Sequence, residues 1–192
     1  MSIPRDLSLR TTPQGVRLFQ EPADIIRNSL GRITHNRLEE QKNLTVENRE
    51  VDLKRKDHLS GNTYWITASI KIGSATEAGF RVACKRDTLG RVLQETVIGY
   101  DAVRHQLFID KSHSGQGREG KSSVHYVPVP STDSVLQLQI LLDNSSLEVF
   151  AGNGASVYTT MIYPDADADG LFVYAKGGDI MVNDLKIWNL VR

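Results

Sequence analysis

The stretch LQLQILLDNSSLEVFAGNG, residues 136–154, decides the fold. Over residues 136–142 apolar side chains alternate with Gln137 and Gln139, so a strand here has one apolar and one polar face. The residues DNSS at 143–146 favour turn geometry because they hydrogen-bond their own backbone. The chain then returns through a second apolar run that stops at residues 152–154, GNG. The stretch predicts two strands folded back on each other.

Short runs of the same kind recur along the chain, rich in β-branched and aromatic residues and separated by turn signals about every 8–12 residues. One helical turn is expected at residues 22–30, ended by Gly31, and Pro128 and Pro130 suit an edge strand or a loop. This pattern predicts an all-β fold, a two-sheet antiparallel β-sandwich of the jelly-roll or concanavalin-like kind. The further expected strands are 7–11, 16–20, 32–38, 44–53, 64–72, 79–84, 91–100, 106–110, 157–163, 170–174 and 179–190.

Composition limits the classes of protein and partner. A chain of 192 residues is long enough for one sizeable core, so one domain is the default. Twenty-three basic and twenty-three acidic residues give no net charge, and the densest basic run, KRK at 54–56, is flanked by Asp52 and Asp57. We therefore expect no nucleic-acid partner. No apolar run approaches the ~20 residues of a membrane span, and the first ten residues lack the apolar stretch of a secretory signal.

No familiar catalytic or cofactor pattern stands out. Cys84 is the single cysteine and is expected to be a small core residue. The five histidines lack metal-ligand spacing, and no G-x-S-x-G elbow is present. Residues 115–122, GQGREGKS, satisfy the phosphate-loop formula, but the loop runs into SVHYVPVP, which cannot begin the helix that would hold the phosphates. A glycine-rich surface loop is the better interpretation, and no cofactor is expected.

An acidic run at residues 165–170, DADADG, copies the first half of a calcium loop. The twelfth position, where a bidentate glutamate should close the site, is Lys176. An acidic turn between two strands is one interpretation, and a calcium ion held by Asp165, Asp167 and Asp169 outside the EF-hand pattern is the alternative.

Several segments resemble glycoside hydrolase family 32, which comprises fructan hydrolases, inulinases, levanases and invertases. The stretch LLDNSSLEVFAGNG followed by TTMIYP is similar to the pattern near the C-terminus of that family. Residues 3–7, IPRDL, resemble the family's P-R-E-L junction, and GYD at 99–101 with LFIDKSHSG at 107–115 resembles its G-Y-D and I-D-R-T-x-S-G segments. The departures are Lys111, where the family usually has arginine, and the acidic run. The resemblance covers nearly the whole chain in the right order.

The resemblance implies a β-sandwich whose catalytic partner, a five-bladed propeller, is not in this chain. The family's propeller carries W-M-N-D-P-N-G, R-D-P and E-C motifs, and none of them occurs here. Retaining glycoside hydrolysis needs two carboxylates placed across the bond, and no pair can be nominated, so no catalytic residue is assigned. We expect residues 1–8 to be an interdomain junction and residues 9–192 to be one sandwich domain. Glu148 is interpreted as a structural or interfacial carboxylate.

Two functions follow from the resemblance. In the first, the chain is a non-catalytic module that stabilises the propeller of a fructan or sucrose hydrolase, which would be extracellular or periplasmic. In the second, it is a fructan-binding module acting on its own. Sugar sites need an aromatic face and a few polar groups, and the candidates are Tyr100, Asp101, Asp110, His113 and Arg118. The simpler interpretation is that these residues close a hairpin.

Overall fold

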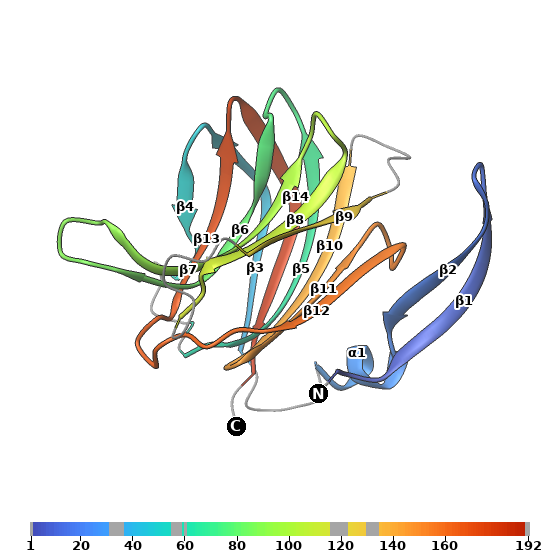
Figure 1. Cartoon of the computed structure of the whole chain (residues 1–192), viewed down its shortest axis with the longest axis horizontal. Helices are drawn as coiled ribbons and strands as arrows, with labels where there is room; N and C mark the ends of the chain where they lie inside the picture. The colour runs from blue at the N-terminus through green and yellow to red at the C-terminus, as the bar shows by residue number, and fades with distance from the viewer. Residues whose placement is uncertain are drawn as a thin grey trace.

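The computed structural model describes residues 2–30, 37–54, 59, 61–115, 123–129 and 135–190. Its strands form two six-stranded antiparallel sheets that face each other, with a separate two-stranded hairpin beside them (Figure 1). Sheet I has the order β12-β11-β10-β5-β14-β3, and sheet II has the order β4-β13-β6-β7-β8-β9. The expected all-β sandwich is confirmed. The strands are β1 (Arg5–Thr12), β2 (Gly15–Pro22), β3 (Arg37–Glu47), β4 (Glu50–Asp52), β5 (Thr63–Ile72), β6 (Glu77–Arg86), β7 (Val92–Asp101), β8 (Gln106–His113), β9 (Val124–Pro128), β10 (Val135–Asp143), β11 (Ser146–Ala151), β12 (Ser156–Met161), β13 (Gly170–Lys176) and β14 (Asp179–Asn189), with one helix, α1 (Asp24–Leu30).

The stretch at residues 136–154 folds as predicted. Strands β10 and β11 pair from Leu138 opposite Ala151 to Asp143 opposite Ser146. Asn144 occupies the turn with φ of 36°, a left-handed conformation that asparagine tolerates better than most residues. Strand β10 also pairs with β5, so the hairpin lies inside sheet I. The alternating residues of β10 are buried, and Gln137 and Gln139 lie on the opposite face.

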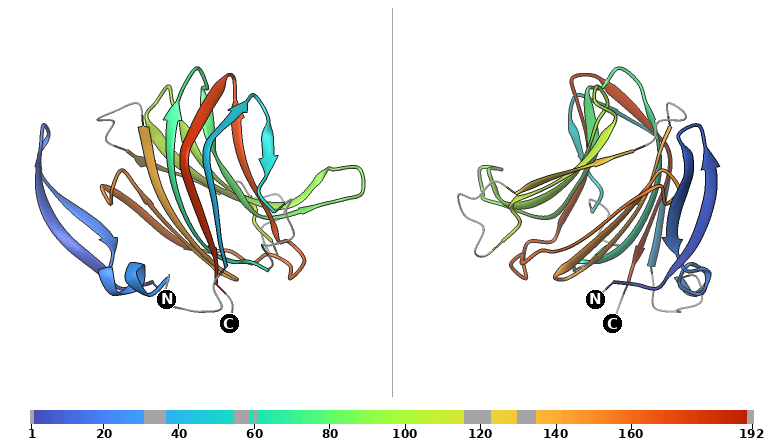
Figure 2. Two further views of the ribbon diagram at one scale, coloured as in Figure 1. Left: turned by 180° about the vertical axis from the view of Figure 1, so that it is seen from behind. Right: turned by 45° about the vertical axis from the view of Figure 1, so that its right-hand side comes forward.

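The main core lies between the inner faces of the two sheets. It contains Ile66 and Ile140 from sheet I and Phe80, Ile98 and Ile109 from sheet II, all fully buried. Trp65 and Phe150 alternate with core residues and so lie on the outer face of sheet I, yet both are buried. Figure 2 shows α1 and the β1–β2 hairpin on this outer side, and Arg5 of β1 lies over the Phe150 ring.

One expectation for the chain is wrong in detail. Separate strands were expected at 32–38 and 44–53, but a single strand, β3, runs through Arg37–Glu47, and the short β4 follows. Residues 32–36 lie outside the described residues. The polar run EEQK at 39–42 hid this strand because β3 is at the edge of sheet I, where a strand need not be apolar. The expected edge position of Pro128 is confirmed, since it ends the edge strand β9.

Candidate functional site

The β1–β2 hairpin is anchored to sheet I through a buried carboxylate. Glu148, in the middle of β11, has a side chain that is only 2% exposed. Its Oε1 accepts a hydrogen bond from the backbone N–H of Ile3 at 2.7 Å, and its Oε2 accepts one from Arg5 Nη2, also at 2.7 Å. The Arg5 guanidinium lies over the Phe150 ring and donates to Thr159 Oγ1 at 2.6 Å. Charge-assisted bonds of this length are among the strongest in proteins.

A second contact holds the middle of the hairpin. The backbone N–H of Gln20 donates to the carbonyl oxygen of Gly154 at 2.9 Å. Gly154 has φ of 84°, and a Cβ there would lie 2.4 Å from the carbonyl oxygen of Gln20. Only glycine therefore permits this approach between the β11–β12 turn and the hairpin. Arg10 stacks over the Phe19 ring and pairs with Glu21.

One face of the hairpin is apolar and exposed. Leu9 stands opposite Leu18, and Leu7 and Val16 continue the same face, because residues paired across an antiparallel ladder share a side. These four side chains are 48–74% exposed. We call them the hairpin's apolar face. A two-stranded hairpin is marginally stable alone, and exposed apolar patches are a frequent feature of interaction surfaces.

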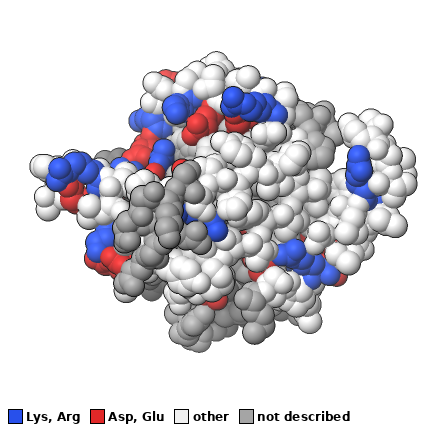
Figure 3. Space-filling view, in the orientation of Figure 1, with Lys and Arg blue, Asp and Glu red and all other residues white. Residues whose placement is uncertain are grey.

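A groove lies between the hairpin and the sandwich. Its volume is about 550 Å³, and the hollow it forms is visible at the right of Figure 3. Phe19 and Arg10 line its hairpin side, and Tyr100 and His105 line its floor at the β7–β8 turn. Tyr100 Oη and His105 Nδ1 are 3.0 Å apart, and burial, with Asp101 nearby, raises the pKa of Tyr100.

The sugar-binding candidates from the sequence do not form one cluster. Tyr100 lines the groove, whereas Asp101 caps the β7–β8 turn, accepting bonds from the backbone N–H groups of Val103 and Arg104. Asp110 accepts a bond from the Ser112 N–H, and His113 ends β8. Tyr100 pairs with Leu107, three residues from Asp110 along β8, a separation of about 10 Å. Arg118 lies outside the described residues.

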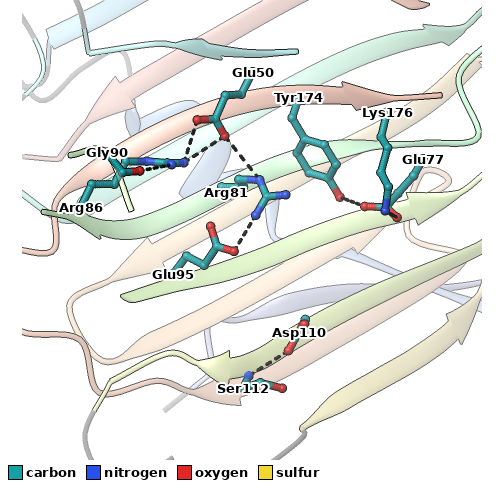
Figure 4. A network of polar contacts seen from close by, with 10 residues as sticks. All are labelled: Glu50, Glu77, Arg81, Arg86, Gly90, Glu95, Asp110, Ser112, Tyr174 and Lys176. Atoms are coloured by element: carbon teal, nitrogen blue, oxygen red, sulfur yellow. Dashed lines mark hydrogen bonds and ion pairs between the residues drawn. The ribbon is translucent and has the colours of Figure 1, made fainter. Parts of the chain in front are cut away.

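The outer face of sheet II carries a network of ion pairs (Figure 4). Arg81 Nη1 lies 2.5 Å from Glu95 Oε1, and Glu50 bridges Arg81 and Arg86. Arg81 also stacks over the Tyr174 ring, and burial, followed by the charge of Glu77, raises the Tyr174 pKa. Each arginine is matched by a carboxylate, which is the arrangement of a structural network.

The acidic turn is occupied by lysines. Lys85 Nζ lies 3.0 Å from Asp165 Oδ2 and 2.9 Å from Asp167 Oδ1, and Lys54 Nζ lies 2.5 Å from Asp169 Oδ2. Among the described residues no group of three or more metal-ligating side chains comes together. An ammonium group thus stands where a cation would bind, and the calcium alternative stays a prediction.

Other sequence expectations concern the glycine-rich loop, Cys84 and membrane spans. Of the phosphate-loop formula, only Gly115 is described, and it bridges to Tyr163. The chain is next described at residue 123, and the strand β9 follows. Cys84 is buried, as expected. Within the described part of the chain, no helix has the length and apolarity to cross a bilayer.

Fold and site together define a two-sheet β-sandwich domain with an anchored hairpin that presents an apolar face. Residues 32–189 match the family described as Glycosyl hydrolases family 32 C terminal, and the chain belongs to this family. The resemblance noted in the sequence is confirmed. The hairpin and α1, which precede residue 32, lie outside the matched range.

Relatives of known name agree with this assignment. The chain is 34% identical to a levanase of Bacillus subtilis (strain 168) over 199 residues, 100% of this chain and 27% of that protein. It is 28% identical to an extracellular exo-inulinase of Aspergillus awamori, over 98% of this chain and 35% of the relative. The crystal structure of exo-inulinase from Aspergillus awamori superimposes with a TM-score of 0.81 and 25% identity, over 99% of this chain and 35% of that one. The chain thus spans about a third or less of these relatives.

Sequence reasoning identified Glu148 as structural or interfacial but did not find its partner. Arg5 lies 143 residues away in the chain, and no periodic pattern connects them. It also missed the groove, whose walls come from the hairpin and from both sheets. The available signal was the polar face of β10, from which Gln137 lines the groove.

Proposed function

We propose that this chain is a non-catalytic module of a fructan or sucrose hydrolase and that it stabilises the catalytic propeller of its parent. The family assignment supports this proposal, together with the lack of the N-D-P, R-D-P and E-C motifs in the sequence. A general acid in glycoside hydrolysis needs a raised carboxyl pKa. The carboxyl groups with a shifted pKa in the described part, Asp87, Asp101, Asp165 and Asp179, all have it lowered by hydrogen bonds.

The observation that carries the proposal is the anchored hairpin. Its inner contacts to Glu148 and Gly154 fix its position, while its apolar face points to solvent. Covering a leucine side chain contributes about 1.5–3 kcal/mol, so a partner over Leu7, Leu9, Val16 and Leu18 gains a substantial part of its binding energy there. In this scheme residues 1–8 form the junction that leads the chain from the propeller into the hairpin. Residues 9–192 act as one domain.

Calorimetry on a protein that joins the parent's propeller to this chain tests the proposal. We expect one cooperative unfolding transition at a higher temperature than that of either part, because binding to the folded state raises its stability. Two transitions at the temperatures of the separate parts would count against a stabilising role. The purified chain is expected to release no fructose from sucrose, levan or inulin, and release would show that it is catalytic by itself.

A fructan-binding module acting independently is the second candidate function. It is favoured by the groove that contains Tyr100, one of the aromatic residues singled out in the sequence. Titration calorimetry with levan, inulin and fructose is expected to show saturable heat in this case. No heat at millimolar ligand would remove the claim.

A further inference from the structure

The outer face of sheet I carries a patch of neutral polar side chains beside the hairpin. Gln137 pairs with Ser69, and Gln139 pairs with Thr67, so these four side chains lie on one face of the neighbouring strands β10 and β5. Ser69 also pairs with Asp184 of β14, which extends the patch to a third strand. Three strands span about 10 Å, which is room for a short chain of sugar rings.

This patch is hollowed and adjoins the groove. A depression of about 230 Å³ is lined by the patch together with Phe150 and Asn153. Gln137 and Asn153 also line the 550 Å³ groove, so the two cavities share a wall. The groove and the depression therefore adjoin at these two residues, beside the hairpin. We call the two adjoining cavities together the hairpin cleft.

The chemistry of the hairpin cleft favours one class of ligand. Its hydrogen-bonding groups are mainly amides and hydroxyls, which both donate and accept. Arg10, the one Lys or Arg among the described residues that line it, is already paired with Glu21, so this described lining holds no unpaired basic cluster for phosphates. Gln137 Nε2 already donates to Ser69 Oγ at 3.1 Å, and an apolar chain would still remove the polar groups of the patch from water at a cost in free energy.

Two further features match a ligand rich in hydroxyl groups. Asp184 lines the depression, and its Oδ1 is buried without a hydrogen-bond partner. Buried polar atoms ordinarily have a hydrogen-bond partner. A hydroxyl group that donated to this carboxylate would supply the hydrogen bond that Asp184 lacks. Phe19, which is half-buried, supplies aromatic surface along the cleft, and binding sites of small molecules combine such surface with a few placed polar groups.

We propose that the hairpin cleft binds a neutral oligosaccharide, with Gln137, Gln139, Thr67 and Ser69 bonding its hydroxyl groups and Asp184 accepting from one of them. The ligand class follows from the side chains of the cleft. The choice of fructose chains as the first ligands rests on the proposed function.

Titration calorimetry on the 192-residue chain tests this proposal with four probes: inulin-type and levan-type fructo-oligosaccharides, a cello-oligosaccharide and a malto-oligosaccharide. We expect saturable binding of at least one probe. The variants Thr67→Val, which keeps the side-chain volume, and Gln139→Ala should each weaken it about three- to tenfold, the effect of losing one hydrogen bond. The matched control is Gln106→Ala, another strand glutamine that does not line either cavity.

The outcomes separate this proposal from the proposed function. One outcome is that a glucan probe binds, no fructan probe does, and Thr67→Val and Gln139→Ala each weaken the glucan binding. This result would support oligosaccharide binding in the hairpin cleft and count against a fructan ligand. Absence of saturable heat with all four probes at ~10 mM, corresponding to binding weaker than about −3 kcal/mol, would overturn the cleft and leave the stabilising role intact. Binding that both variants leave unchanged would also overturn it. Circular dichroism and thermal unfolding confirm that each variant is folded.

Discussion

Replacing Glu148 with glutamine should release the hairpin from the sandwich. The side chain keeps its shape but loses its charge, and its new amide NH₂ group meets the Arg5 guanidinium, which is also a donor. Breaking a fully buried ion pair by changing one partner costs about 3–5 kcal/mol. Arg5 is 20% exposed, so water compensates part of this loss, and we expect about 2–3 kcal/mol.

Hydrogen exchange detected by mass spectrometry measures this loss locally. The amides of β1 and β2 exchange through detachment of the hairpin, so Glu148→Gln should speed their exchange roughly 30- to 150-fold, with little change in β5 or β10. The control is Glu21→Gln, which breaks the Arg10–Glu21 pair on the same hairpin at 40% and 23% exposure. Exposed pairs contribute about 0–1 kcal/mol, so its effect should stay below about fivefold. Equal exchange rates in the two variants would refute the anchoring role of Glu148.

Three further outcomes are expected. Burial, then the charge of Glu95, raises the Cys84 pKa to about 12, so a thiol reagent at pH 8 should modify it only on unfolding; prompt reaction would contradict this. Gly99→Ala should lower the melting temperature by about 3–10 °C, because its Cβ would lie 2.1 Å from a Phe108 ring carbon; an unchanged value would refute the tight packing. Hydrogen bonds from Ser74 lower the Asp179 pKa, so their stabilisation is present above pH ~4 and is lost as the pH falls through the lowered pKa. In urea unfolding, the free energy of unfolding of Ser74→Ala should therefore be lower than that of the wild type at pH 7, and the two values should converge near pH 3. A difference that stays constant with pH would argue against this linkage.

Much of the fold was predictable because its strands have clear alternation. The β10–β11 hairpin was found from its apolar face and its DNSS turn. Strand β3 was only partly found, since residues 39–42 of this edge strand are polar. Local sequence carries a strand signal only where one face is buried, and an edge strand weakens that signal.

The site was less predictable because it is made by contacts between distant segments. The sequence singled out Glu148 but not Arg5 or the Ile3 amide as its partners, since their positions depend on where the hairpin docks. The sugar candidates were grouped by nearness in sequence, yet Tyr100 and Asp110 lie at separate places along the β7–β8 pair. A motif identifies the neighbours of a residue in the chain, whereas a cleft depends on its neighbours in space.

Binding between the separately purified propeller of the parent and this chain is the most direct measurement of the stabilising role. Titration calorimetry should show saturable binding to the wild-type chain. The double variant Leu9→Ser with Leu18→Ser, which makes the hairpin's apolar face polar, should bind at least about tenfold more weakly. No binding by the wild type, or equal binding by the double variant, would contradict the account.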